Sequence, residues 1–511
     1  MQQESRVKKS LLNARVNLIF YFLTLVLSFF SRKIFLDGLG ADFIGLTGTL
    51  GNLLAFLNLA ESGVSAAIAV VLYAPLLEHN EQKIKEIVSV MGYLYHTIGK
   101  IILSGGLLLA CFFPLIFPDA ELGLPIIYLT FFSFLGTSLI GYFINYKQVL
   151  LSADQRNYVV AAYSQSANVV KILLQMGLAY YTGNYYLWVV VEFLFGILYS
   201  IILNWKIKQV YPWLVTEVKK GKALCKEYPD VMRYTKQLFI HKIGSVAYTQ
   251  VTPFLVYAFA SLQAVAYYGN YTLITSKVSS LLGNFLGGTN ASVGNLIAEG
   301  DKNKILKVYW ELMSIRFLFV GVAVFAMYHL LPPFIALWLG REYVMSQTLL
   351  IIVLITFALG IIRGVTEEFL IGYGLFSDVW SPFVEAAILI IVAISGGNLW
   401  GFEGTLLGSV VSNIIIIYIW KPYFLFTRGL KISVKVYWIE LVKYILSVSI
   451  SFYITYSLLQ LVSLQFNIFS SWIDWIIYAV ILTLMLTFVI GSVLLLITKG
   501  ARNLCLRLMR K

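Results

Sequence analysis

The stretch QTLLIIVLITFALGII, residues 347–362, decides the fold class because it is continuously apolar and does not alternate. A helix that crosses a bilayer needs ~20 mostly apolar residues, and the chain contains about fourteen such runs. Only helices and closed barrels satisfy the backbone in the bilayer core, and a barrel strand would alternate. The sequence therefore predicts an all-α polytopic membrane protein with spans at 13–36, 43–73, 92–117, 124–149, 157–181, 184–205, 236–260, 264–292, 305–331, 346–372, 380–398, 402–426, 435–461 and 471–498.

Composition supports this class. Of the 511 residues, 59% are hydrophobic and 12% are charged, whereas a soluble domain has ~25% charged residues. The three cysteines are far apart and indicate neither a disulfide nor a metal framework. The first apolar run is too long for the core of a cleavable signal peptide. We interpret the net charge of +13 as loop charge facing an anionic leaflet, not as a nucleic-acid surface.

Basic residues give the orientation. Lys and Arg cluster in every second gap between apolar runs, at 6–15, 83–85, 147–156, 206–236, 302–307, 421–435 and 499–511. The alternate gaps hold only Arg32, Lys33 and Arg341, although the inside gap 373–379 also has no basic residue. Translocation disfavours basic loops, so we expect both termini in the cytoplasm and an even number of spans.

The polar stretch 206–235 divides the chain, and the two parts share a faint repeat. Glu78, Lys83 and Ile84 recur at a constant offset as Glu299, Lys304 and Ile305. Two six-helix lobes in the same orientation would be related by an axis along the membrane normal, around a central cavity. The predicted domains are an N-lobe with its cytoplasmic linker (1–233), a C-lobe (234–433), and two further helices with a basic tail (434–511).

Three segments carry a family resemblance. They are SRKIFLDGLGADFIGLTGTLGNLLAFLNLAESGVSAAI (31–68), VLLSADQRNYVVAA (149–162) and FLIGYGLFSDVWSPFVEAA (369–387). With them the chain resembles the polysaccharide-transporter branch of the multidrug/oligosaccharidyl-lipid/polysaccharide exporter superfamily, the Wzx-type O-antigen and capsule flippases. The resemblance covers nearly the whole chain, and its patterns are typical of the family without being strict signatures.

The resemblance implies a cargo and a place in the cell. The cargo would be an oligosaccharide on undecaprenyl pyrophosphate, moved from the cytoplasmic to the periplasmic leaflet of a bacterial inner membrane by alternating access. The products would be lipopolysaccharide, capsule or exopolysaccharide, with polysaccharide polymerase or ligase machinery as possible partners. The predicted number of spans, about fourteen, is similar to the number in lipid II flippases and larger than the twelve of many Wzx proteins. Lipid II therefore stays an alternative cargo.

Lys277 is the sharpest candidate for cargo binding. It lies about 20 Å from the outer end of its span at 1.5 Å per residue, which is near the midplane. An ionisable residue there costs roughly 2.5–3.5 kcal/mol and therefore usually faces a cavity or a partner. Its neighbours Ser276, Ser279 and Ser280 are small and polar. Lys277 could anchor the pyrophosphate, or be a structural lysine that snorkels or pairs.

Three further residues extend a proposed basic path from the cytoplasmic side. His241 and Lys242 lie about one and a half turns into their span and could line an inward-open vestibule with Gln250. Arg15 lies at the same level in the first span. The alternatives are interfacial snorkelling of Lys242 and Arg15 and a hydrogen-bonded His241.

The in-span acids have other roles. Glu61 shares a polar run with Asn52 and Asn58, and could balance the cations, bind a coupling proton or Na⁺, or form a simple ion pair. Equal depth in adjacent antiparallel spans predicts a structural ion pair between Lys171 and Glu192.

A second structural pair and one unassigned cation complete the in-span charges. Arg363 and Glu367 lie four residues apart on one helix face, which predicts pairing. Arg316 has no obvious partner in the sequence.

Two other classes compete with the flippase. A multidrug/cation antiporter should expose acids in its cavity, whereas the candidates here are mostly basic. A membrane glycosyltransferase or polymerase generally carries a large outside loop with catalytic residues, and the outside gaps here are short. No nucleotide loop, catalytic triad or metal cluster is present in the sequence. We therefore expect no enzyme, no cofactor and no nucleic-acid partner, with coupling to H⁺, Na⁺ or the membrane potential left open.

Overall fold

The computed structural model describes residues 6–61, 63–118, 122–154, 156–286, 290–375, 377–461 and 466–509. Within these ranges all regular structure is helical, which confirms the predicted class. Nine helices of the described part are long and apolar enough to cross a membrane, so the chain is a multi-pass membrane protein. The exact arrangement of about fourteen spans in two lobes stays a prediction, as do the domain boundaries at 233 and 433.

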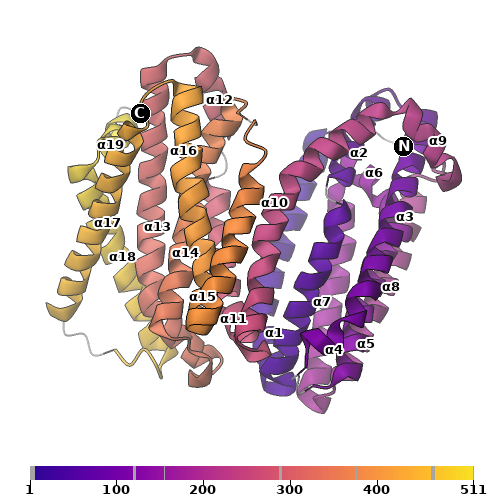
Figure 1. Ribbon diagram of the computed structural model, residues 1–511, viewed down its shortest axis with the longest axis horizontal. Coiled ribbons are helices and arrows are strands. Elements are labelled where there is room, and N and C mark those ends of the chain that lie inside the picture. The colour runs from indigo at the N-terminus through magenta and orange to yellow at the C-terminus, as the bar shows by residue number, and fades with distance from the viewer. Residues whose placement is uncertain are drawn as a thin grey trace. The chain divides into compact units, whose positions relative to one another are not determined.

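The chain forms two compact units (Figure 1). Unit 1 comprises Met1–Tyr257 and Ser261–Ala266, and unit 2 comprises Ala258–Ala260 and Tyr267–Lys511. Unit 1 holds α1 (Arg6–Leu57), α2 (Val64–Leu77), α3 (Glu81–Cys111), α4 (Phe113–Ile116), α5 (Leu124–Phe143), α6 (Gln148–Ala153), α7 (Asn157–Thr182), α8 (Tyr185–Val210), α9 (Gly221–Glu227) and most of α10 (Pro229–Phe259).

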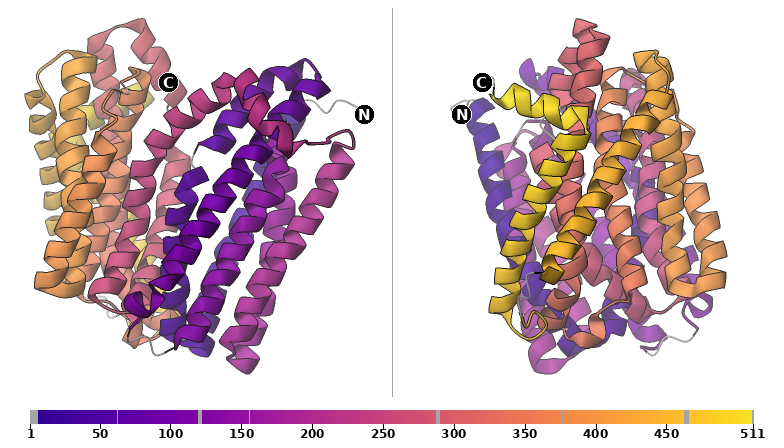
Figure 2. Two further views of the ribbon diagram at one scale, coloured as in Figure 1. Left: turned by 45° about the vertical axis from the view of Figure 1, so that its right-hand side comes forward. Right: turned by 90° about the vertical axis from the view of Figure 1, so that its left-hand side faces the viewer.

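Unit 2 continues the chain with most of α11 (Leu262–Leu286), then α12 (Asn290–Glu299), α13 (Lys302–Trp338), α14 (Gln347–Gly372), α15 (Ser381–Ser412), α16 (Lys421–Phe424), α17 (Lys435–Leu461), α18 (Trp472–Ile497) and α19 (Lys499–Met509). Two π-helical segments, Asn413–Trp420 and Leu425–Leu430, flank α16. The right-hand view of Figure 2 shows α19 turning away from the axis of α18.

Several predicted spans are not single straight helices. Gly40, at φ 78° and ψ 163°, interrupts α1 between the first two predicted spans. The second predicted span is broken again, because α1 ends at Leu57, a 3₁₀ turn covers Asn58–Glu61, and Gly63 has a φ of 98°. Glycine tolerates these positive φ angles because it has no Cβ. The second break places Glu61 at a discontinuity in a membrane helix.

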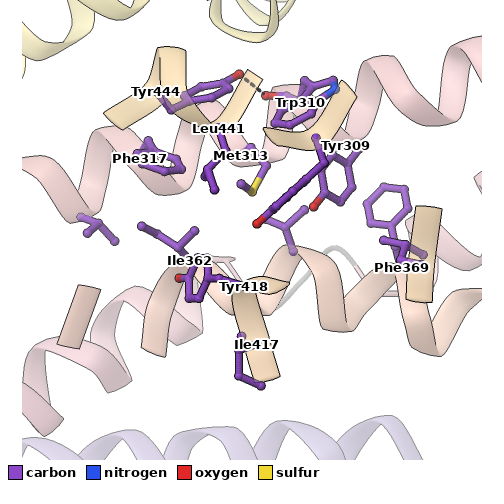
Figure 3. Close-up of a cluster of buried hydrophobic side chains, with 14 of the residues drawn as sticks. Tyr309, Trp310, Met313, Phe317, Ile362, Phe369, Ile417, Tyr418, Leu441 and Tyr444 are labelled. Atoms are coloured by element: carbon purple, nitrogen blue, oxygen red, sulfur yellow. Dashed lines mark hydrogen bonds between the residues drawn. The ribbon is translucent and has the colours of Figure 1, made fainter. Parts of the chain in front are cut away.

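Aromatic side chains fill the core of unit 2, as Figure 3 shows. The ring of Trp310 on α13 stacks on Tyr444 of α17 with centroids 5.7 Å apart and planes at 13°. Tyr444 also donates its hydroxyl to the Trp310 carbonyl over 3.0 Å. Because lipid tails are as apolar as these side chains, such packing and hydrogen bonds, and not the hydrophobic effect, hold membrane helices together.

The backbone of α15 folds back on itself. Trp400 and Gly401 have non-helical angles, and Gly401 has a φ of 57°. A Cβ on Gly396 would lie 2.4 Å from the Gly404 carbonyl oxygen, and one on Gly404 would lie 2.0 Å from that of Gly396. The two halves of α15 therefore form a tight hairpin in which glycine is required on both sides.

The faint sequence repeat corresponds to two turns of the same construction. Before α3, His79 has a φ of 54° and the side chain of Asn80 caps the helix by accepting from the Lys83 amide. Before α13, Gly300 has a φ of 78° and the side chain of Asp301 caps the helix in the same way. These caps satisfy helix amides that would otherwise have no partner.

The same turns carry the same ion pair. Lys83 Nζ lies 3.7 Å from Glu78 Oε2, and Lys304 Nζ lies 2.5 Å from Glu299 Oε2. Each pair closes the turn that leads into a long helix of its unit. The matching conformation, cap and ion pair show that the sequence repeat has a structural counterpart at this position.

Candidate functional site

The carboxylate of Glu61 is held by hydroxyl groups. The hydroxyl of Tyr95 on α3 and Ser65 Oγ, the latter over 3.0 Å, donate to Glu61 Oε1. Tyr142 of α5 donates to Glu61 Oε2 over 3.0 Å. Both tyrosine side chains are buried in unit 1. No Lys or Arg of the described ranges forms a salt bridge with Glu61, so hydroxyl groups are the partners of this carboxylate in the described part of the chain.

Asn58 extends this site by one helical turn. Its Oδ1 accepts from Ser138 Oγ over 3.0 Å and from the Tyr142 hydroxyl over 3.1 Å. The cluster formed by Asn58, Glu61, Ser65, Tyr95, Ser138 and Tyr142 is called the Glu61 cluster below. The atoms that meet in these hydrogen bonds are oxygens, namely Asn58 Oδ1, both Glu61 carboxylate oxygens and the hydroxyl groups, and oxygen ligands suit a proton or a hard cation such as Na⁺. No group of three His, Cys, Asp or Glu that could hold a metal exists in the part of the chain described here.

The helix break is what positions the Glu61 cluster. Asn58 and Glu61 lie in the 3₁₀ turn between α1 and α2, in the middle of a predicted span. Irregular backbone at membrane depth is tolerated only where protein or a water-filled cavity surrounds it. Discontinuous membrane helices of this kind build the ion and substrate sites of many transporters. The sequence singled out Glu61 but did not identify the two tyrosines, which lie on helices distant in the chain.

The basic candidates lie in both units. Arg15 is exposed on α1 in unit 1. Lys277 is half-buried on α11 in unit 2, next to the exposed Ser276 and Ser280. Both serines donate to carbonyls of their own helix, Ser276 to Leu273 and Ser280 to Ser276. The side chains of His241 and Lys242, on α10, lie outside the described residues.

The pair predicted from equal depth lies close together. Lys171 Nζ is 2.7 Å from Glu192 Oε1, and Gln175 donates to Glu192 Oε2 over 3.0 Å. The side chains of Lys171 and Glu192 are each 18% exposed. A polar cavity of about 220 Å³ adjoins them between α5, α7 and α8. This salt bridge therefore belongs to the interior of unit 1.

The predicted pair on α14 has a third member. Arg363 Nη2 lies 2.7 Å from Glu367 Oε1, and Arg363 Nη1 lies 3.7 Å from Glu385 Oε1 on α15. The guanidinium thus lies between two carboxylates, of which the sequence predicted one. Glu385 was missed because its spacing from Arg363 carries no helical periodicity.

Other ion pairs of unit 2 were not predicted, including the following two. Arg316 on α13 binds Glu368 on α14 and also donates to the Ile361 carbonyl over 2.7 Å. Lys421 Nζ on α16 lies 2.7 Å from Oδ2 of Asp378, a residue that lies just before α15. Arg316, Glu368 and Asp378 are all buried. For these two pairs the sequence contains one hint: Arg316 lies inside a predicted span, where a charged side chain usually has a partner.

Comparisons with known proteins bear on the fold. The structure matches that of the lipid II flippase MurJ in an inward closed conformation, with a TM-score of 0.65, 16% sequence identity, and coverage of 93% of this chain and 98% of that chain. It also matches an inward-facing multidrug resistance MATE family transporter of the MOP superfamily, with a TM-score of 0.59, 15% identity, and coverage of 80% and 95%.

No protein-family model matches the sequence, and no curated protein is significantly similar to it. At 15–16% identity the structural matches show a shared fold. The matched proteins are transporters and flippases. The chain therefore shares its fold with this flippase over 93% of its length and with this transporter over 80%.

Proposed function

We propose that the protein is a flippase for an undecaprenyl-pyrophosphate-linked oligosaccharide, a repeat unit of O-antigen, capsule or exopolysaccharide. It would move this lipid from the cytoplasmic to the periplasmic leaflet of a bacterial inner membrane by alternating access. The observation that carries the proposal is the match over 98% of a lipid II flippase chain. The family resemblance of the sequence supplies the cargo class, and lipid II itself is the first alternative.

The charge of the candidate residues supports an anionic cargo. Lys277, Lys242, His241 and Arg15 would form a basic path for the pyrophosphate, since cations bind phosphate through charge-assisted hydrogen bonds. Lys277 is the central anchor in this proposal, because it lies near the midplane of its predicted span.

The Glu61 cluster supports coupling to an ion. Its carboxylate has three hydroxyl donors and no salt bridge with a basic residue of the described chain. Binding or release of a proton or Na⁺ at Glu61 would change the charge at the broken helix. Such a change favours one of two conformations only if the ion binds them with different affinity.

The test is a flipping assay with purified protein in liposomes. An NBD-labelled undecaprenyl-pyrophosphate oligosaccharide is reconstituted, and dithionite reduces only the label in the outer leaflet. We expect the protein to raise the reducible fraction from about half to nearly all. NBD-labelled lipid II and the cation ethidium are run beside it. If lipid II is flipped faster than the labelled oligosaccharide lipid, the assigned cargo changes to lipid II. If ethidium is transported and neither lipid is flipped, the proposal that the protein is a flippase is wrong.

Variants of Lys277 test the cargo anchor. Lys277→Ala should slow flipping by about 10- to 100-fold, because a hydrogen bond to a charged group contributes about 1.5–3 kcal/mol. Lys277→Arg should retain most of the rate. Lys302→Ala removes one exposed charge at the start of α13 and is the matched control. Undiminished flipping by Lys277→Ala at equal reconstitution would remove Lys277 from the site.

The antiporter remains the second candidate because one observation favours it. The Glu61 cluster is an acidic site without a basic partner in the described residues, and the fold also matches a MATE family transporter. An antiporter would move ethidium against a proton or Na⁺ gradient and lose this activity in Glu61→Gln. A flippase would not transport ethidium, with or without a proton or Na⁺ gradient.

A further inference from the structure

Unit 2 contains an apolar pocket that neither the cargo path nor the Glu61 cluster uses. It has a volume of about 390 Å³ and lies between α15, the π-helical segment Asn413–Trp420 and α17. Its walls include Trp380, Ile419, Trp420, Tyr423 and Trp438. This volume lies in the range of ~300–1,000 Å³ that is typical of small-molecule sites.

The aromatic walls form a fixed frame. The Trp380 and Trp420 rings lie with centroids 4.7 Å apart, and Trp420 stacks on Phe424 at 5.8 Å and 14°. Ile419 is 50% exposed and Tyr423 is 48% exposed. Since these exposed apolar side chains belong to membrane helices, the pocket opens to the hydrocarbon of the bilayer. Its natural occupant is therefore an apolar chain that arrives from the bilayer.

An unusual backbone shapes this pocket. Ile415, Ile416, Ile419 and Trp420 all line it and all belong to the π-helical segment. In a π-helix each amide bonds five residues back, so side chains four and five positions apart share a face. π-helical turns are rare and frequently occur at functional sites. The wide turn here collects four apolar side chains on the side that faces Trp380 and Trp438.

Exposed cations lie close in the sequence to residues that line the pocket. Lys431 and Lys435 flank Val434, which together with Trp438 lines the pocket from the start of α17. Arg428 lies in the second π-helical segment. All three are exposed and form no salt bridge within the described residues. Lys421, in contrast, is paired with Asp378. The chain next to the lining residue Val434 therefore carries exposed cations that a bound anion would neutralise.

We propose that this pocket binds one anionic phospholipid of the bilayer, with an acyl chain between Trp380, Trp420 and Trp438 and the phosphate at Lys431 and Lys435. A basic pocket between membrane helices at the cytoplasmic side is a recurrent site for anionic head groups. The charge pattern of the sequence predicts this end of α15 and α17 to be cytoplasmic. The proposal is independent of the cargo, because phosphatidylglycerol is a resident lipid and is not translocated.

The experiment is native mass spectrometry of the delipidated full-length protein titrated with phosphatidylglycerol and with phosphatidylcholine of the same chains. We expect one phosphatidylglycerol to bind at least 10-fold more tightly than phosphatidylcholine. The double variant Lys431→Ala/Lys435→Ala should lose this preference. Its matched control, Lys219→Ala/Lys222→Ala, removes two exposed charges from the cytoplasmic linker and should keep it.

A second variant separates the acyl chain from the head group. Ile419→Trp fills the pocket without changing charge, and should weaken long-chain phosphatidylglycerol at least 10-fold while leaving dihexanoyl phosphatidylglycerol unchanged. Equal binding of the two lipids, or full preference in the Lys431/Lys435 variant, would overturn the proposal. Stronger binding of undecaprenyl phosphate than of phosphatidylglycerol would also overturn it, because the site would then serve the carrier lipid.

Discussion

Glu61 in unit 1 and the in-span acids beside Arg316 and Arg363 in unit 2 are held by different kinds of partner. In unit 1, Glu61 is held by the hydroxyls of Ser65, Tyr95 and Tyr142 and has no salt bridge with a described basic residue. In unit 2, the in-span carboxylates near Arg316 and Arg363 form salt bridges. Paired charges are fixed because breaking the pair leaves one charge buried alone. A carboxylate held by hydroxyls can change its charge without losing its partners, so unit 1 contains the better candidate for a switch.

The largest effect is expected where the pairing is most buried. Arg316→Met leaves Glu368 without its cation between α13 and α14 and should cost about 3–5 kcal/mol of folding stability. Thermal or SDS unfolding of the purified protein measures this cost. The double variant Arg316→Met/Glu368→Gln should recover most of the loss. If Arg316→Met is as stable as the wild type, the salt bridge between Arg316 and Glu368 does not stabilise unit 2, and the contrast with Glu61 is lost.

The salt bridge of unit 1 should contribute less. Lys171→Met leaves Glu192 with its hydrogen bond from Gln175, and both charged side chains are 18% exposed. We expect a loss of about 1–3 kcal/mol in the same unfolding measurement. Flipping measured per folded protein should be unchanged. A large drop in the flipping rate at normal stability would show that Lys171 and Glu192 take part in transport and do not only stabilise the fold.

Glu61→Gln should separate stability from transport. The amide keeps the size of the side chain and can still accept from a hydroxyl, so the stability change should be within about 1 kcal/mol. Transport driven by a proton or Na⁺ gradient should lose its gradient dependence. The matched comparison is Glu192→Gln, which removes an in-span acid of the same unit that already has a cation. Gradient dependence retained in Glu61→Gln would show that the switch lies elsewhere.

The smallest effect is expected at Glu385. Its Oε1 lies 3.7 Å from Arg363 and forms no hydrogen bond within the described residues, while Arg363 keeps Glu367 as its closer partner. Because Arg363 keeps Glu367 and a glutamine adds no buried charge, Glu385→Gln should change unfolding stability by only about 0.5 kcal/mol. A loss above about 2 kcal/mol would mean that Arg363 depends on Glu385 as Arg316 depends on Glu368.

Much of the fold was predictable because bilayer thickness imposes a length on every span. Apolar runs of ~20 residues give the helices directly, and the spacing of Arg363 and Glu367 gives their pairing. The helix break at Asn58–Gly63 was not predicted, because hydropathy averages over such a short turn. It is visible in the sequence only as a polar run that contains Glu61 and Gly63.

The unpredicted part of the candidate site depends on contacts between distant residues. Glu368 lies 52 positions from Arg316, and Tyr142 lies 81 positions from Glu61. No periodicity links residues on different helices. Aromatic residues are also common in membrane proteins for other reasons, so Tyr95 and Tyr142 carried no distinguishing signal in the sequence. An in-span charge indicates that a partner exists without identifying it.

The glycine hairpin of α15 bears on how the chain enters the membrane. Gly396 and Gly404 bring the two halves into backbone contact, and only the turn at Trp400 and Gly401 separates them. Such a pair has no soluble loop to translocate, and neither half can pack until the other is present. The two halves should therefore leave the translocon together as one hairpin. A single added methyl group at Gly404 would act during biogenesis, before any transport cycle begins.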